Sequence, residues 1–121
     1  MNIETILSAV SFNSHGLVMA IAQDHLTKEI LMVAWMNRET LTETIRTNRM
    51  VYWSRSRKSR WLKGETSGHV QLVKSIRIDC DGDSLLFSVA QTDAACHENY
   101  RSCFFRELQN NEWVITETKV C

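Results

Sequence analysis

The alternation of apolar and polar positions predicts a domain built mostly of β strands. Short apolar or alternating runs bounded by turn-forming residues are typical of strands. Turn signals separate several of them: Asp81-Gly82 favours a tight hairpin, and Asn110-Asn111 favours another near the end of the chain. The predicted strands are residues 17–22, 30–36, 50–53, 72–78, 85–89, 104–108 and 113–118, with a turn over residues 24–28.

One segment has helical character. Asn37 is a typical N-cap residue, Glu39 follows in the first turn, and Leu41 and Ile45 fall on one face. These features predict a helix over residues 38–47. Residues 55–68 are basic, polar and interrupted by glycine, which predicts a loop. The expected fold is therefore α+β, mostly strands with one clear helix, in a single domain over residues 1–121.

Composition and charge narrow the class of protein. The chain has 121 residues, and 14 basic residues balance 14 acidic ones. No overall field therefore attracts nucleic acid or a membrane surface. No apolar run reaches the roughly 18 residues that a membrane span needs, and the first residues lack the basic and apolar regions of a signal peptide. We expect a cytoplasmic protein, whose four cysteines bind metal or stay free rather than form disulfides.

Three carboxylates gather at the predicted turn between the strands 72–78 and 85–89. Asp79, Asp81 and Asp83 are close enough to repel one another, and a divalent cation would relieve that repulsion. A solvated acidic turn is the alternative. An EF-hand loop fits poorly, because it needs glycine at its sixth position and glutamate at its twelfth, whereas Gly82 is fourth and Ala90 is twelfth.

The thiols offer a second type of metal site. Cys80, Cys96 and Cys103 make three ligands, and three protein ligands with one open position are typical of catalytic zinc. Cys121 is the last residue, and no Cys-x-x-Cys pair is present. The alternative is that these cysteines are small buried apolar side chains. His97 follows Cys96 directly, and it is a candidate ligand, proton carrier or surface residue.

The basic segment between residues 49 and 64 carries aromatic residues among its cations. It suits either a surface for single-stranded nucleic acid or a pocket for a phosphate-bearing ligand with an aromatic base; a solvated loop is the third possibility. Two glycines and the hydroxyls of Thr66 and Ser67 favour the pocket, because they offer donors to phosphate oxygens. The basic residues are Arg49, Arg55, Arg57, Lys58, Arg60 and Lys63, interleaved with Tyr52, Trp53 and Trp61.

Six stretches, in order and at matching spacing, resemble the phosphoribosyl-AMP cyclohydrolase family of histidine biosynthesis. The resemblance extends over roughly residues 17–106, and six collinear motifs are far more specific than any one of them. The stretches are residues 34–37 (AWMN), 52–57 (YWSRSR), 61–69 (WLKGETSGH), 79–83 (DCDGD), 96–97 (CH) and 102–104 (SCF).

The resemblance implies a reaction and the residues that serve it. The reaction is hydrolytic opening of the adenine ring of phosphoribosyl-AMP between N1 and C6, giving the formimino-aminoimidazole carboxamide ribonucleotide. The family is an intertwined homodimer with its sites at the interface, and it acts on a small nucleotide rather than on nucleic acid. One zinc per subunit would be held by Cys80 of one protomer with Cys96 and Cys103 of the other, and magnesium by Asp79, Asp81 and Asp83.

The remaining site residues are expectations from residue type. His97 is expected to act as general base or proton shuttle. A phosphate-bearing substrate needs cations and hydroxyl donors, which are expected from Arg55, Arg57, Lys63, Thr66, Ser67 and His69. A zinc-stabilised module for single-stranded nucleic acid is the alternative function.

The chain departs from the family pattern near Cys96. Asp93-Ala94 stands where the family often has Gly-Pro, and Asn99 where it often has glycine. Asparagine tolerates a left-handed backbone, so the loop is expected to keep its shape at residue 99. Arg60 replaces a commonly apolar residue. We also expect a monofunctional enzyme, without the pyrophosphohydrolase domain that many relatives carry.

Overall fold

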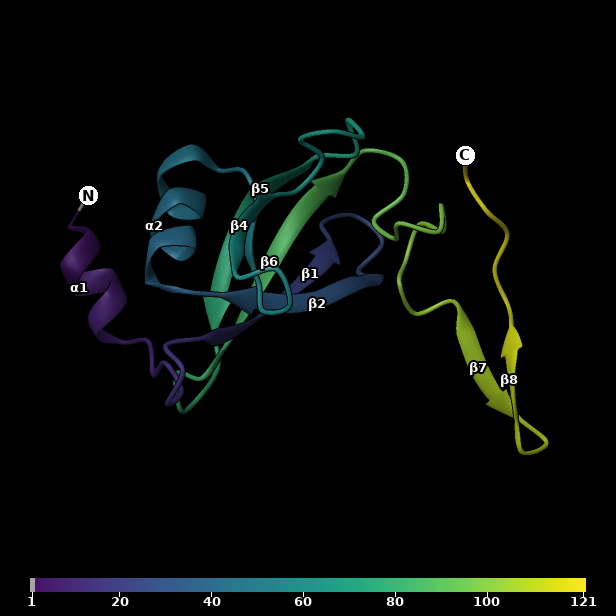
Figure 1. Ribbon diagram of the computed structural model, residues 1–121, viewed down its shortest axis with the longest axis horizontal. Helices are drawn as coiled ribbons and strands as arrows, with labels where there is room; N and C mark the ends of the chain where they lie inside the picture. The colour runs from purple at the N-terminus through teal and green to yellow at the C-terminus, as the bar shows by residue number, and fades with distance from the viewer. Residues whose placement is uncertain (1) are drawn as a thin grey trace.

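A six-stranded sheet forms the centre of the computed structural model, which describes residues 2–121 (Figure 1). Its strands follow the order β4-β3-β2-β1-β6-β5, and every neighbouring pair is antiparallel except β1 with β6. Because β1 and β6 run parallel, the loops that follow them leave the sheet at the same edge. The strands are β1 (Val18–Asp24), β2 (Ile30–Met36), β3 (Val51–Ser54), β4 (Ser59–Leu62), β5 (Gln71–Ile78) and β6 (Ser84–Gln91).

The predicted helix is confirmed over its full length as α2 (Arg38–Thr47). The Asn37 side chain accepts a hydrogen bond from the Thr40 amide at 2.8 Å, and the Thr40 hydroxyl accepts one from the Asn37 amide at 3.0 Å. This reciprocal cap pairs two amides that the first helical turn leaves without partners. Asn48 ends the helix in a left-handed conformation at φ 58°.

The expectation of one clear helix was wrong, because a second helix, α1 (Ile3–Ser8), precedes the sheet. Six residues are too few to show a helical period, and only Leu7 is buried. Its signal was the cap: the Asn2 side chain accepts a hydrogen bond from the Thr5 amide at 3.2 Å. The fold is thus α+β, mostly strands with two helices.

The prediction of a loop over residues 55–68 was also wrong in part, because this segment contains β4. The strand pairs with β3, so that Tyr52 faces Trp61 and Trp53 faces Arg60. Polar Ser59 and Arg60 hid the strand in the sequence, but an edge strand needs only one apolar face. The other predicted strands are confirmed with ends shifted by up to three residues, and the turns at 24–28 and 81–82 are confirmed.

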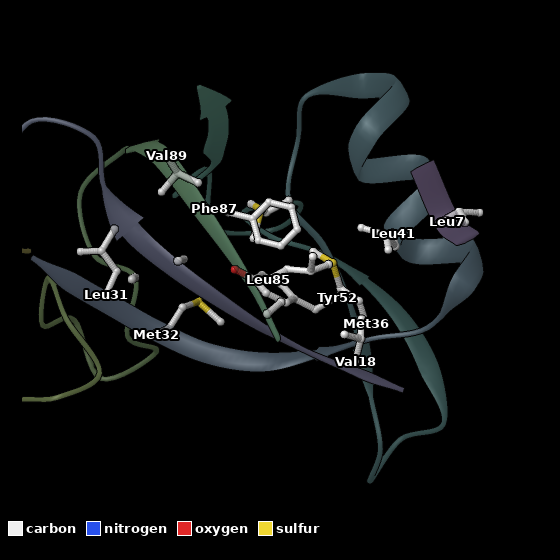
Figure 2. Packing of buried hydrophobic residues seen from close by; sticks show 14 residues of the cluster. Leu7, Val18, Leu31, Met32, Met36, Leu41, Tyr52, Leu85, Phe87 and Val89 are labelled. Atoms are coloured by element: carbon white, nitrogen blue, oxygen red, sulfur yellow. The ribbon is translucent and has the colours of Figure 1, made fainter. Parts of the chain in front are cut away.

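Packing uses one face of the sheet, and α1 and α2 close one end of this core through Leu7 and Leu41 (Figure 2). Burial alternates along β1, where Val18, Ala20 and Ala22 are buried, and along β6, where Leu85, Phe87 and Val89 are buried. These side chains meet Leu41 of α2 and Leu7 of α1. The strands that carry the two predicted metal sites are therefore anchored in one core.

The opposite face of the sheet carries apolar side chains that the helices do not cover. Met19 pairs with Trp35 and Ile21 with Val33 across β1 and β2, and Leu86 lies beside Ile21 on β6. Met19, Ile21, Trp35 and Leu86 are only partly buried, and Val33 is exposed.

A separate hairpin, β7 (Arg106–Gln109) with β8 (Glu112–Ile115), projects away from the main sheet (Figure 1). Its pairing places Leu108 opposite Trp113 and Arg106 opposite Ile115, so the three apolar side chains share one face. Leu108, Trp113 and Ile115 are all more than half exposed, Trp113 at 68%. Within residues 2–121, no helix is long and apolar enough to cross a membrane.

Candidate metal centre and adjoining pocket

The acidic turn between β5 and β6 brings its three carboxylates together as predicted. One oxygen each of Asp79, Asp81 and Asp83 lies within 4.8 Å of the other two. The Asp79 carboxylate also accepts hydrogen bonds from the backbone amides of Asp83 at 3.0 Å and Ser84 at 3.2 Å, which shape the turn. The Ser11 amide donates to the Gly82 carbonyl at 2.8 Å and holds the turn against the segment after α1.

The carboxylates of this turn perturb one another. The pKa of Asp83 is raised, because Asp81 and Asp79 share hydrogen bonds with its side chain and place negative charge beside it. The pKa of Asp79 is lowered: loss of water contact would raise it, but hydrogen bonds from Asp83, Ser84 and Asp81 outweigh that effect. Three exposed oxygen donors under mutual repulsion fit a hard divalent cation such as magnesium.

The loop after β6 folds back on itself and brings Cys96 next to Cys103. The Ala95 amide donates to the Arg101 carbonyl at 2.9 Å, and the Cys96 amide donates to the Tyr100 carbonyl at 3.1 Å. The Cys103 amide donates to the Leu31 carbonyl at 2.7 Å, and this hydrogen bond fixes the second half of the loop against β2. The two thiols influence each other electrostatically, since the Cys96 thiol helps to raise the pKa of Cys103.

The environment of this thiol pair bears on metal binding. Cys96 is buried, and the Glu98 amide points at its sulfur from 3.5 Å. Cys103 is exposed as a residue, but burial of its thiol raises the pKa to about 11; the Cys96 thiol adds to this, and the Lys63 ammonium opposes it. Two converging soft donors beside a cation suit zinc better than magnesium.

Cys80 does not join this pair within one chain. It lies in the turn before β6, whereas Cys96 follows the far end of that strand. Eight residues of extended strand span about 26 Å. Among residues 2–121, the acidic turn is the one place where three possible metal-ligating side chains converge.

A hollow of about 360 Å³ adjoins the thiol pair. Loop 64–69 forms one wall of it and the loop after β6 forms the other, and Cys96 and His97 both line it. Its lining is largely polar, which suits a charged ligand. Of the predicted substrate contacts, the hollow brings together Arg57, Lys63, Thr66, Ser67 and His69.

Some of the basic residues have other partners. Arg55 lies outside the hollow and stacks over the Trp35 ring, 5.1 Å from its centroid. Arg60 lines the hollow, but it binds Glu43 of α2 through two hydrogen bonds, of 2.6 and 2.5 Å. Lys63 is buried. The basic segment therefore presents fewer free cations than its sequence suggests, which weakens the case for a nucleic-acid surface.

A clamp between Asp24 and Arg101 was not predicted from the sequence. The Arg101 guanidinium donates to the Asp24 carboxylate at 2.6 Å and to the Asp93 carbonyl at 3.3 Å. Asp24 also accepts from the amides of Leu26 and Thr27. The ion pair ties the loop of Cys96 to the turn after β1, and its separation of 77 positions along the chain hides it from sequence patterns.

Replacing Asp24 with asparagine should lower stability in a pH-dependent way. Burial would raise the pKa of Asp24, but hydrogen bonds from Thr27 and Leu26 and the charge of Arg101 outweigh it, so the pKa is lowered. A lowered folded-state pKa contributes stability above the unfolded value, and this contribution is lost as pH falls through the folded value.

We expect Asp24→Asn to cost about 2 kcal/mol of unfolding free energy at pH 7. The difference from the parent protein should shrink below about pH 4, where the parent carboxylate also takes up its proton. Denaturant unfolding at several pH values measures the loss of unfolding free energy and its dependence on pH. Glu117→Gln, at an exposed position, is the control. If the difference in unfolding free energy between the parent and the variant stays constant down to pH 2, the ionised Asp24 carboxylate is not the source of the stability.

The departures from the family pattern near Cys96 fit the backbone that the loop adopts. Asn99 adopts φ 70°, so its left-handed conformation is confirmed, and Asp93 adopts φ 54°. Both belong to the few residue types that enter this region readily. An oxygen of the Asp93 carboxylate also lies 3.9 Å from Nε2 of His69, a residue that lines the hollow.

Comparison with known proteins decides the family. The family described as "Phosphoribosyl-AMP cyclohydrolase" matches residues 32–105, a stretch that contains both predicted metal sites and the hollow. The chain belongs to this family. Membership makes it an enzyme, a cyclohydrolase, and confirms the family to which the six motifs pointed.

Relatives of the cyclohydrolase extend the match over nearly the whole chain. A protein of Salinibacter ruber named phosphoribosyl-AMP cyclohydrolase is 52% identical over 117 residues, which cover 97% of this chain and 92% of that protein. One of Nitrosomonas eutropha with the same name is 55% identical, covering 92% and 87%. One of Halorhodospira halophila, again so named, is 53% identical, covering 93% and 79%.

Proposed function

We propose that this cyclohydrolase opens the adenine ring of phosphoribosyl-AMP by hydrolysis of the bond between N1 and C6, in the biosynthesis of histidine. The observation that carries the proposal is the hollow that Cys96, His97, Arg57 and loop 64–69 line together. It brings together a thiol suited to zinc, an imidazole able to carry a proton, and cationic and hydroxyl groups able to donate to phosphate oxygens. The name of the relatives supports the substrate.

Zinc is the metal that the thiols fit, with Cys80, Cys96 and Cys103 as its ligands, one ion per subunit. Zinc on three protein ligands keeps one position open for water and lowers the pKa of that water. Asp79, Asp81 and Asp83 would hold magnesium in the turn that carries Cys80. The turn would then be ordered where it has to present its thiol.

A second copy of the chain completes the zinc site in this proposal. Cys80 lies about one strand length from Cys96 and Cys103, so a partner has to supply it. Two apolar surfaces suit that partner: the uncovered face of the main sheet and the apolar side of the β7–β8 hairpin, whose Trp113 is 68% exposed. An isolated two-stranded hairpin is marginally stable in water, so it too benefits from a partner.

The side chains around the hollow then have separate tasks. Arg57, Thr66 and Ser67 would bind phosphate oxygens through charge and hydroxyl donors. His97 is exposed beside Cys96, and it would accept a proton from the attacking water and deliver one to N1 as the bond to C6 breaks. His69 would contact the substrate at the mouth.

An ultraviolet assay with phosphoribosyl-AMP tests the function directly, since ring opening changes the absorption of the base. We expect turnover that falls at least about 100-fold when zinc is removed by chelation and returns when zinc is added back. Circular dichroism checks that the chelated protein remains folded. Absence of turnover in folded, zinc-loaded protein would contradict the proposal, and salt-sensitive binding of single-stranded RNA by that protein would favour the alternative.

A further inference from the structure

Lys63 has surroundings that a phosphate-binding lysine would not have. It follows Leu62 at the end of β4, and only 7% of the residue is exposed. Its ammonium donates a hydrogen bond to the Ala95 carbonyl at 2.6 Å and lies 5.1 Å from the centroid of the Trp61 ring. The side chain is thus turned against the residue that precedes Cys96.

A buried ammonium needs a negative partner. Buried lysines are rare unless paired, because removing a full charge from water costs several kcal/mol. Over residues 2–121 no carboxylate lies within ion-pair distance of Lys63. The groups whose negative charge acts on it are the thiols of Cys103 and Cys96; burial lowers its pKa, and these two thiols oppose that shift.

A zinc site with three thiolate ligands carries a net negative charge, which would favour a cation such as the Lys63 ammonium beside it. Three thiolates and one Zn²⁺ sum to a single negative charge, which is costly in a half-buried site. A lysine ammonium held at the carbonyl of Ala95, the residue before Cys96, offsets that charge. It also draws electron density from the sulfurs, which limits the loss of Lewis acidity that three thiolate ligands cause.

We propose that Lys63 is a positioning residue of the zinc site: its ammonium, held by the Ala95 carbonyl and the Trp61 ring, compensates the negative charge of the Cys96 and Cys103 thiolates and fixes the backbone beside Cys96. The inference rests on the proposed function, in that it takes these cysteines as zinc ligands. Lys63 would then support the metal site without binding the metal, and phosphate binding would fall to Arg57 and the hydroxyls of loop 64–69.

Two variants separate the charge of Lys63 from its hydrogen bond. Lys63→Gln keeps an N–H donor but removes the charge, whereas Lys63→Arg keeps the charge. We expect Lys63→Gln to weaken zinc binding by about 10- to 100-fold, measured by competition with a chromophoric chelator, as is typical when a group that supports metal ligands is removed. Lys63→Arg should recover most of the affinity, and the exposed control Lys74→Gln should match the parent protein.

Cobalt provides a readout that a merely structural role of Lys63 would not change. In Co²⁺-loaded protein, the sulfur-to-metal charge-transfer band reports how strongly the sulfurs hold their electrons. Loss of a nearby cation should move this band to longer wavelength in Lys63→Gln and leave it in place in Lys63→Arg. If Lys63→Gln does not fold, Lys63→Met, an uncharged side chain suited to burial, replaces it with the same expected shift.

The outcomes separate this inference from the proposed function. A charge-transfer band at the parent wavelength in Lys63→Gln, or zinc affinity equal to that of the parent, would overturn the role of Lys63. Failure of the parent protein to open the ring in a zinc-dependent way would instead overturn the proposed function, which the ultraviolet assay measures without any variant. Weaker zinc binding with a shifted band, restored by arginine, is the result that we expect.

Discussion

Cys103→Ala should abolish turnover and lower the zinc content of the purified protein. The expected loss of kcat/KM is at least about 1000-fold, because the proposed zinc site would lose one of its ligands and not merely a substrate contact. Cys103 and Cys96 lie on the two arms of the loop after β6, which backbone hydrogen bonds hold together, so removal of the Cys103 thiol leaves one soft donor of the pair. Zinc content by metal analysis and turnover by ultraviolet absorbance measure the two effects separately.

Cys121→Ala is the matched control for this substitution. Cys121 is also an exposed, free cysteine, but it lies at the last residue, outside the loop of Cys96. It should leave both zinc content and turnover unchanged. Full activity with normal zinc in Cys103→Ala would remove this residue from the metal site, and a loss in Cys121→Ala would show that general thiol chemistry was being measured.

Gly64→Ala should strongly damage the substrate pocket. Gly64 adopts φ 83°, and a Cβ placed there would lie 2.6 Å from the Val70 nitrogen and 2.7 Å from the His69 carbonyl carbon. Both contacts are with backbone atoms, which cannot move aside without reshaping loop 64–69. We expect a loss of about 3 kcal/mol in unfolding free energy and at least a tenfold rise in KM, since this loop forms one wall of the hollow.

Gly68→Ala separates the steric clash from the backbone conformation. Gly68 has nearly the same φ, 80°, but a Cβ there meets nothing within 4 Å. Its substitution should therefore cost only the left-handed conformation, about 1 kcal/mol, with a smaller change in KM. Thermal melts and steady-state kinetics compare the two variants. Equal effects of both would refute the close packing of Gly64 against Val70.

Local signals in the sequence were enough to predict much of this fold. The helix over residues 38–47 follows from its cap, since Asn37 and Thr40 lie three residues apart and need no distant partner. The acidic turn follows from Asp81-Gly82 between two apolar runs. Features that depend on one peptide segment are the ones that a single sequence shows best.

Features that depend on packing between distant segments could not be predicted. β4 has polar residues at its start and is a strand because β3 lies beside it. The burial of Lys63 follows from the loop 32 residues later that covers it. The candidate site divides in the same way: its candidate ligands could be proposed from the sequence, but the separation of Cys80 from Cys96 became visible only in the sheet.

We propose that the zinc site of this enzyme is assembled from two copies of the chain. Cys80→Ala and Cys103→Ala proteins with different tags can be produced together, and the mixed dimers purified through both tags. Each mixed dimer would contain one site with every ligand and one site lacking two. We predict that these dimers open phosphoribosyl-AMP at about half the parent rate, although each variant alone is inactive. Zinc-loaded mixed dimers without turnover would contradict the shared site.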